Sequence, residues 1–253
     1  MNIKNIPAYC KLMLGIKADE TLGFRLVTKL AKHLVPTYRF TWPELAWFRN
    51  PNLNNVLSMF EEAEGFNAHR RLALQQLLRL TSDIPGDTAE CGVYKGCGSY
   101  IILQANAQSL FSRVHHIFDS FEGLSKPDEK DGQYWAASDL SISENIVGQN
   151  LSEFDHVKLY RGWIPRRFVE VDSHTFSFVH VDVDLYEPTS ESIGFFYPRL
   201  NKGGIFVCDD YGFLTCPGAT AAIDEFLLSK PEKMLTLPGG GGFFIKGCVT
   251  SPE

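Results

Sequence analysis

Two pairs of aspartates, each placed directly after an apolar run, are the residues of this sequence best suited to chemistry. Asp182 and Asp184 end the run FSFVHVDVD, and Asp209 and Asp210 end the run GGIFVCDD. Such runs predict buried strands, and residues two apart in a strand point to the same side. We therefore expect these carboxylates to gather near one point at the ends of two central strands.

Carboxylates gathered at the end of a buried sheet repel one another and are costly to desolvate. A divalent cation would remove that cost, and carboxylate ligands with room for water suit Mg²⁺, with Mn²⁺ or Ca²⁺ as substitutes. A bound Mg²⁺ can lower the pKa of a substrate hydroxyl, and a neighbouring carboxylate can take the proton. The alternative is that the acids cap the helices that follow them.

A glycine-rich turn follows the first predicted strand in the segment DTAECGVYKGCGS. Glu90 ends the strand, and Gly92, Gly96 and Gly98 permit a tight turn with close backbone approach. The glycines fall at the first, fifth and seventh positions, whereas the dinucleotide fingerprint GxGxxG needs the first, third and sixth. The pattern favours a ligand-binding loop over a plain turn, but not a pyrophosphate cradle.

The ends of the next two predicted strands carry further candidates. Asp119, in HHIFDSF, is placed to accept hydrogen bonds from ribose hydroxyls, but a dehydrogenase would also have an acid there. Trp163 follows VKLYRG, where its ring could flank a flat base or pack in the core.

Strands that alternate with helices must position these residues. The predicted strands cover 88–93, 115–121, 157–162, 176–184 and 203–210, and the predicted helices 97–108, 142–151, 190–200 and 219–228. Alternation of this kind predicts parallel βαβ units in a doubly wound α/β sheet, whose ligands bind at the carboxyl ends of the strands. The final KMLTLPGGGGFFIKG predicts an antiparallel hairpin that closes the sheet.

The N-terminal residues 1–80 are predicted to form a helical extension, followed by the main domain over 81–253. The predicted helices of the extension cover 22–34, 55–66 and 69–80. The basic pairs Arg70–Arg71 and Arg166–Arg167 are predicted to lie on solvated helix faces rather than at phosphate sites.

The segment 123–143 is long, polar and irregular. A loop of this length is often a lid over a site, and Tyr134 and Trp135 within it could stack on a sugar ring. The alternative is a disordered surface loop.

Composition excludes some classes of function. The chain has 253 residues and a net charge of −6, so nothing favours nucleic acid or an anionic membrane as a partner. Six cysteines without a CxxC pair or zinc-finger spacing indicate a reducing compartment. No signal peptide or membrane-spanning run is predicted, so we expect a cytoplasmic protein; a homo-oligomer is left open.

Several motifs, specific as a set although weak singly, resemble those of class I S-adenosylmethionine-dependent methyltransferases. They are similar above all to the macrocin O-methyltransferase (TylF-like) family of sugar O-methyltransferases, from about residue 70 to the C-terminus. The matching segments are PGDTAECGVYKGCGS, IFDSFEGL, the stretch around YRGWIP, VHVDVDLYEPT, and GGIFVCDDYG with PGATAAIDEF.

The resemblance implies a Rossmann-like, mostly parallel seven-stranded sheet with an antiparallel last strand. It implies a Mg²⁺-dependent transfer of a methyl group from S-adenosylmethionine to a hydroxyl of a sugar or other small-molecule natural product, with the N-terminal extension as a substrate cap. It does not identify the acceptor.

The resemblance also assigns residues. The implied cofactor-binding residues are Glu90, Gly92, Val93, Tyr94, Gly96, Ser99, Asp119, Ser120, Gly162, Trp163 and Asp182. The implied Mg²⁺ ligands are Asp182, Asp209 and Asp210, and the implied general base is Asp182, with Asp184 in reserve.

Three alternatives remain open at this point. A nicotinamide-dependent oxidoreductase would explain Asp119 but neither the glycine spacing nor the paired acids. A non-catalytic protein could have kept the sheet, although intact acids at all these strand ends argue against it. A metal-dependent hydrolase lacks the HxxH or HxH patterns expected for its ligands.

Overall fold

The structure, a computed structural model, describes residues 27–31, 33–34, 45–63 and 67–249. The chain divides into two compact units, Met1–Asn55 and Val56–Glu253. In the first unit, the described part of the helix predicted over 22–34 is helical, and its other residues lie outside the described ranges. A 3-10 helix, η2, spans Ala46–Arg49, and Asn50 caps the start of helix α3 (Pro51–Met59) by accepting a 3.0 Å hydrogen bond from the Asn52 N–H.

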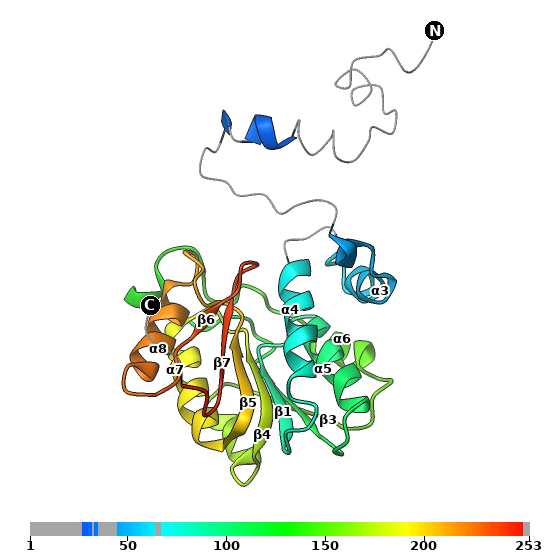
Figure 1. Cartoon of the computed structure of the whole chain (residues 1–253). Coiled ribbons are helices and arrows are strands. Elements are labelled where there is room, and N and C mark those ends of the chain that lie inside the picture. The colour runs from blue at the N-terminus through cyan, green and yellow to red at the C-terminus, as the bar shows by residue number, and fades with distance from the viewer. Residues whose placement is uncertain (1–26, 32, 35–44, 64–66, 250–253) are drawn as a thin grey trace. The chain divides into compact units, whose positions relative to one another are not determined.

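The second unit is built on a seven-stranded sheet with strand order β3-β2-β1-β4-β5-β7-β6 (Figure 1). Strands β1 to β5 are parallel to one another, and β7 runs antiparallel to both β5 and β6. This confirms the predicted fold, including the reversed strand. The strands are β1 Asp87–Cys91, β2 His115–Asp119, β3 Val157–Arg161, β4 Phe176–Val181, β5 Leu200–Cys208, β6 Leu235–Thr236 and β7 Gly242–Ile245.

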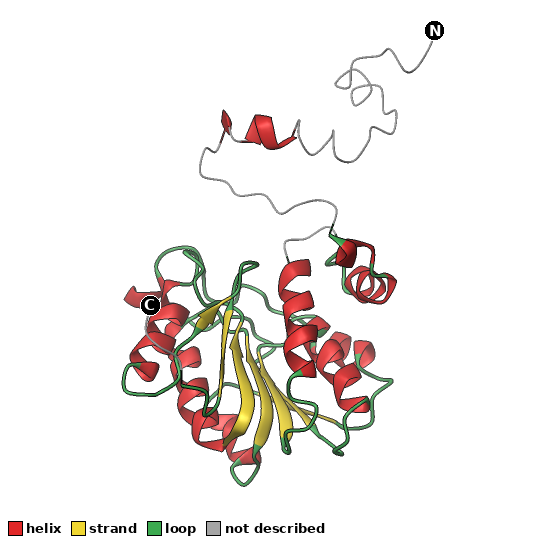
Figure 2. Cartoon of the chain, in the orientation of Figure 1, coloured by secondary structure: helices red, strands yellow, loops and turns green. Residues whose placement is uncertain are grey.

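Helices cover both faces of the sheet (Figure 2). One apolar core contains Phe176, Phe196 and Phe206 and joins the sheet to α7 and α8. The other contains Leu74, Ile101 and Phe178 and joins it to α4, α5 and α6. Each fully buried apolar side chain of this size stabilises the fold by about 1.5–3 kcal/mol. The helices are α3 Pro51–Met59, α4 Ala68–Arg79, α5 Cys97–Ala107, α6 Glu144–Asn150, α7 Tyr186–Phe196 and α8 Pro217–Leu227.

Helix α4 belongs to the compact unit that contains the sheet. This unit begins at Val56 and not at the predicted boundary after residue 80. Its side chains Leu74, Leu77 and Leu78 are buried in the core that also holds Ile101 of α5. The apolar positions of this helix face the core, so α4 is part of the helical layer that covers one side of the sheet.

Two other helices differ in their bounds from the prediction. Helix α7 begins at Tyr186, four residues before the predicted start. Pro188 lies in its first turn, where a proline is tolerated because the missing N–H would have no partner inside the helix. Helix α3 ends at Met59, because Glu61 takes a φ of 60° that breaks the helical path.

The segment 123–143 is folded against the sheet's helices. Its 3-10 helix η3 spans Glu129–Asp131, and the buried Asp131 accepts hydrogen bonds from the N–H groups of Tyr186 at 2.6 Å and Asp128 at 2.8 Å. The alternative of a disordered surface loop is therefore wrong. The polar residues of this segment are used in part to hold it to the start of α7.

Within the described ranges, no helix is long and apolar enough to cross a membrane. The described cysteines Cys91, Cys97, Cys208, Cys216 and Cys248 are free thiols, and Cys10 lies outside the described residues.

Candidate functional site

A cavity of about 630 Å³ opens at the carboxyl ends of the parallel strands, within the size range of small-molecule sites. It lies in the second compact unit. The predicted site residues that line it are Gly92, Tyr94, Asp119, Ser120, Gly162, Trp163, Asp182, Asp184 and Asp210.

One side of the cavity is organised by Asp119 at the end of β2. Its Oδ2 accepts a 2.8 Å hydrogen bond from the Val93 N–H, and its Oδ1 accepts a 2.7 Å bond from the Phe121 N–H. Burial raises the pKa of Asp119. Because each carboxylate oxygen has two lone pairs, the side chain can anchor the loop after β1 and still accept from a ligand hydroxyl.

Gly92 allows the loop after β1 to lie against the end of β4. Its φ is 79°, and an added Cβ would lie 1.8 Å from the carbonyl oxygen of Asp182. This close approach requires glycine, and it brings the loop after β1 next to Asp182. Trp163 is 36% exposed and also lines the cavity, so the core-packing alternative for this residue is wrong.

Four of the predicted cofactor residues, Glu90, Val93, Gly96 and Ser99, are not among those that line the cavity. The buried Glu90 lies behind it, where it accepts a hydrogen bond from the Ser99 hydroxyl and contacts His180 Nδ1 at 2.7 Å. Their part in cofactor binding stays a prediction.

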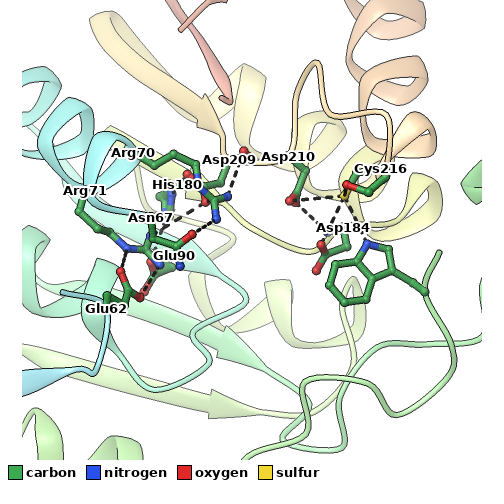
Figure 3. Close-up of polar contacts among 12 residues, drawn as sticks. Glu62, Asn67, Arg70, Arg71, Glu90, His180, Asp184, Asp209, Asp210 and Cys216 are labelled. Carbon is green, nitrogen blue, oxygen red and sulfur yellow. Dashed lines mark hydrogen bonds and ion pairs between the residues drawn. The ribbon is translucent and has the colours of Figure 1, made fainter. Parts of the chain in front are cut away.

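The aspartates after β4 belong to two different clusters. Figure 3 labels His180 and Asp209 of the first, and Asp184, Asp210 and Cys216 of the second. Strand β4 ends at Val181, and Asp184 has a φ of 60°, so the chain turns between the two acids. Asp182 groups with His180 and Asp209, and Asp184 groups with Asp210 and Cys216, with the ligand atoms of each group within 4.8 Å of one another. The prediction of an extended strand through residue 184, with both acids on one side, is therefore wrong.

The first cluster is rich in cations. Arg70 donates a hydrogen bond to Asp209 Oδ2, Arg71 Nη1 lies 4.0 Å from the same oxygen, and His180 Nε2 lies 3.5 Å from Asp209 Oδ1. Burial opposes ionisation, yet the interaction with His180 and the charge of Arg70 lower the pKa of Asp209. Burial likewise opposes charge on His180, but Asp209 and Glu90 raise its pKa to about 10. Asp209 is thus an anion already matched by positive charge.

The prediction that Arg70 and Arg71 lie on a solvated helix face is wrong. Arg71 is 7% exposed and its Nε donates a 2.9 Å hydrogen bond to Glu62. A signal was present in the sequence, because Arg71 shares the helical spacing of the buried Leu74 and Leu78. What the spacing could not show is the acid at the end of a distant strand.

The second cluster holds acids without such cations. Asp210 Oδ2 accepts a 2.8 Å hydrogen bond from the Asp184 N–H, and Cys216 Sγ lies 3.5 Å from Asp184 Oδ1. Trp135 Nε1–H donates to the same sulfur at 3.3 Å. Burial raises the pKa of Asp184 to about 6, and burial with the nearby Asp184 charge raises that of Asp210 well above its usual range.

The donor set fits a divalent cation. Burial and the Asp209 charge raise the pKa of Asp182 to about 7, and in the described part of the chain no ion pair is made by Asp182, Asp184 or Asp210. Arg70, Arg71 and His180 oppose the rise in the pKa of Asp182 but do not cancel it. Buried carboxylates that crowd one another are costly to ionise, and a cation at this place would reduce that cost. Asp209 could join such a site only by sharing its carboxylate with Arg70.

The sequence matches the model of the TylF macrocin-O-methyltransferase family over residues 67–235, more than half of the chain. The chain belongs to the macrocin O-methyltransferase family. The match covers every residue that lines the cavity except Glu62. Membership makes the protein an O-methyltransferase and disfavours the oxidoreductase, hydrolase and non-catalytic alternatives.

Two curated relatives, both named as O-methyltransferases, agree with this placement. The chain is 28% identical over 181 residues to demethyldecarbamoylnovobiocin O-methyltransferase of Streptomyces niveus, covering 63% of this chain and 68% of the relative. It is 30% identical over 162 residues to mycinamicin III 3''-O-methyltransferase of Micromonospora griseorubida, covering 58% and 62%. The crystal structure of the calicheamicin methyltransferase CalS11 superimposes with a TM-score of 0.65 at 20% identity, over 85% of this chain and 97% of that one. The chain thus matches about two thirds of the length of these curated relatives and shares the fold of the solved structure.

Proposed function

We propose that this O-methyltransferase transfers the methyl group of S-adenosylmethionine to a hydroxyl of a sugar-bearing small-molecule natural product, with Mg²⁺ required. The observation that carries this proposal is that one cavity is lined both by Asp119, at the cofactor side, and by Asp182, Asp184 and Asp210. Both curated relatives are named as O-methyltransferases of natural products, and one name specifies a 3'' oxygen.

The cofactor is proposed to lie along the ends of β1, β2 and β3. Asp119 would accept hydrogen bonds from the ribose hydroxyls, and the Trp163 ring would flank the adenine. Gly92 and Tyr94 would lie beside the methionine end. Glu90 and Ser99 would act on the cofactor indirectly, by supporting the loop after β1, since both lie in the buried hydrogen-bond network with His180.

Asp182, Asp209 and Asp210 are the residues proposed to hold Mg²⁺. When bound there, Mg²⁺ supplies Lewis acidity that lowers the pKa of an acceptor hydroxyl. Burial raises the pKa values of Asp182 and Asp210, so a bound cation would favour the ionised form of both carboxyls.

Asp184 is proposed as the proton acceptor in place of Asp182, which is the first expectation from the sequence and stays the alternative. Asp184 lines the cavity and is fixed by its backbone bond to Asp210, whereas Asp182 is assigned to the metal. The acceptor O–H proton passes to the carboxylate as the oxygen forms a bond to the methyl carbon. The S–CH₃ bond breaks, and its electron pair leaves with sulfur, which becomes a neutral thioether.

Calorimetry followed by a turnover assay tests the proposal. The expected result is saturable binding of S-adenosylmethionine, with and without EDTA, and none of NAD⁺. Methylation of deoxysugar glycosides with vicinal hydroxyls should require Mg²⁺ and stop in EDTA. Binding of NAD⁺ in place of S-adenosylmethionine would contradict the cofactor assignment, and full turnover in EDTA would contradict the metal.

A further inference from the structure

A third group of side chains of metal-binding types lies at the opposite ends of the strands from the cavity. Asp87 is the first residue of β1, His116 is the second residue of β2, and His174 precedes β4 by two residues. The cavity acids follow the carboxyl ends of the strands, so the length of β1, about 15 Å at 3.3 Å per residue, separates the two groups.

The three ligand atoms of this group converge. Asp87 Oδ2 lies 3.2 Å from His116 Nε2 and 2.7 Å from His174 Nδ1, and all three atoms lie within 4.8 Å of one another. Zinc bonded to nitrogen and oxygen at 2.0–2.1 Å with tetrahedral geometry spaces its ligands about 3.3 Å apart. To admit the ion, the 2.7 Å contact would have to lengthen by about 0.6 Å and the 3.2 Å contact by about 0.1 Å, with the two histidine nitrogens also brought to about 3.3 Å from each other.

Outer contacts orient the ligands, as is typical of metal sites. Asp87 Oδ1 accepts a 2.9 Å hydrogen bond from the Val114 N–H, and His116 Nδ1 lies 3.0 Å from the Tyr160 hydroxyl. The His116 ring also stacks on Tyr160 and meets the edge of Phe176. The group is thus held by two strands and an aromatic wall.

One side of the group is open to solvent. His116 is fully buried, while the side chains of Asp87 and His174 are 18% and 32% exposed. The hydrogen bonds from His116 and from the Val114 N–H outweigh burial and lower the pKa of Asp87 to about 2, so the carboxylate is anionic over the physiological range. An ion could enter on the His174 side and keep a water ligand there.

We propose that Asp87, His116 and His174 bind one zinc ion, with solvent in the fourth position. The ion would join the beginnings of β1 and β2 to the segment before β4. A purely hydrogen-bonded cluster is the competing interpretation, and it makes no use of a metal.

The experiment is zinc titration of the full chain, stripped with chelator and kept in excess Mg²⁺, compared with H174Q. His174 is partly exposed, so this variant should fold, which circular dichroism checks. His156, an exposed histidine directly before β3, provides the matched control H156Q. We expect H174Q to bind one zinc fewer than the wild-type chain and H156Q to bind the same number.

A second variant and a direct location sharpen the test. Y160F removes only the outer hydrogen bond of His116, and it should weaken the zinc affinity of this site about 10- to 100-fold. Anomalous scattering from zinc-soaked wild-type crystals should place an ion between Asp87, His116 and His174. Absence of that peak, or unchanged stoichiometry in H174Q, would overturn the proposal in favour of the hydrogen-bonded cluster.

Discussion

At the scale of single residues, the adjacent acids after β5 have opposite electrostatic surroundings. Asp209 faces Arg70 and His180, whereas Asp210 faces the carboxylates of Asp184 and Asp182, which raise its pKa together with burial. Adjacent residues at a strand end point to different sides, so one acid enters a cationic network and its neighbour lines the cavity. The same amide substitution should therefore have different effects at the two positions.

Asp209→Asn should destabilise the protein by about 3–5 kcal/mol, because it leaves buried cations without their anion. Asp210→Asn should change stability by less than about 1 kcal/mol, since an amide oxygen can still accept from the Asp184 N–H, yet it should lower turnover by about 10²–10⁴-fold. Urea denaturation and methylation assays of both variants check this. Equal losses of stability at the two positions would contradict the division into two clusters.

His115 makes the fold sensitive to acid. It is fully buried between the hydroxyls of Thr88 and Ser99, and burial lowers its pKa to about 4. Between pH 6.5 and about 4, His115 is protonated in the unfolded chain but neutral in the folded chain. The contribution of His115 to stability is therefore lost as the pH falls through this range.

His115→Asn should be less stable than the wild type at pH 7, and its deficit should shrink by roughly 3 kcal/mol on going to pH 4. Denaturant midpoints of the two proteins across this range measure the difference. A deficit that stays constant with pH would mean that His115 is not buried in its neutral form.

At the scale of elements, the loop after β1 depends on a single glycine. Gly92→Ala would place a methyl group 1.8 Å from a backbone oxygen at a φ of 79°, so it should destabilise by at least about 3 kcal/mol and abolish cofactor binding. Gly194 lies in α7 with nothing within 4 Å of its added Cβ, and Gly194→Ala should stabilise by about 0.5–1 kcal/mol. Thermal unfolding of the pair checks both signs.

The first N–H of helix α7 donates a hydrogen bond to a residue of the distant segment 123–143. Leu185 is its N-cap and makes no side-chain cap, while Asp131 of the segment 123–143 accepts from the Tyr186 N–H. Asp131→Ala should therefore cost about 1 kcal/mol, as loss of a cap does, and raise KM for the acceptor by loosening the cavity wall near Trp135. Ser143, an N-cap residue of α6 whose side chain makes no cap bond, supplies the control S143A, which should change stability by less than about 0.5 kcal/mol.

At the scale of the whole molecule, every residue that lines the cavity belongs to the unit Val56–Glu253. A fragment of residues 50–253, which keeps the Asn50 cap of α3, should bind S-adenosylmethionine with a Kd within about threefold of that of the full chain. If residues 1–49, the part of the predicted substrate cap (1–80) that the fragment lacks, contribute to the acceptor pocket, the fragment should show a raised KM for the acceptor at unchanged cofactor affinity. Calorimetry and steady-state kinetics separate these outcomes, and loss of cofactor binding would contradict the assignment of the cavity to this unit.

Much of the fold follows from local patterns, because apolar period and turn residues are properties of neighbouring positions. The runs that end in Asp119, Asp182 and Asp209 are buried strands or lead directly out of them, and the carboxyl ends of parallel strands must share one edge. The sequence by itself therefore determined the α/β sheet with its reversed strand, the position of the cavity, and the enzyme family.

Only the tertiary structure decided how the acids are divided and what faces them. The hydrogen bond from the Asp184 N–H to Asp210, the buried Arg70 and Arg71 opposite Asp209, and the contact of Trp135 with Cys216 each join segments far apart in the chain. The grouping of Asp87 with His116 and His174 arises in the same way, from strands that lie side by side. Burial and counter-charge depend on such long-range neighbours, and they set which carboxylate is matched and which is left for a ligand.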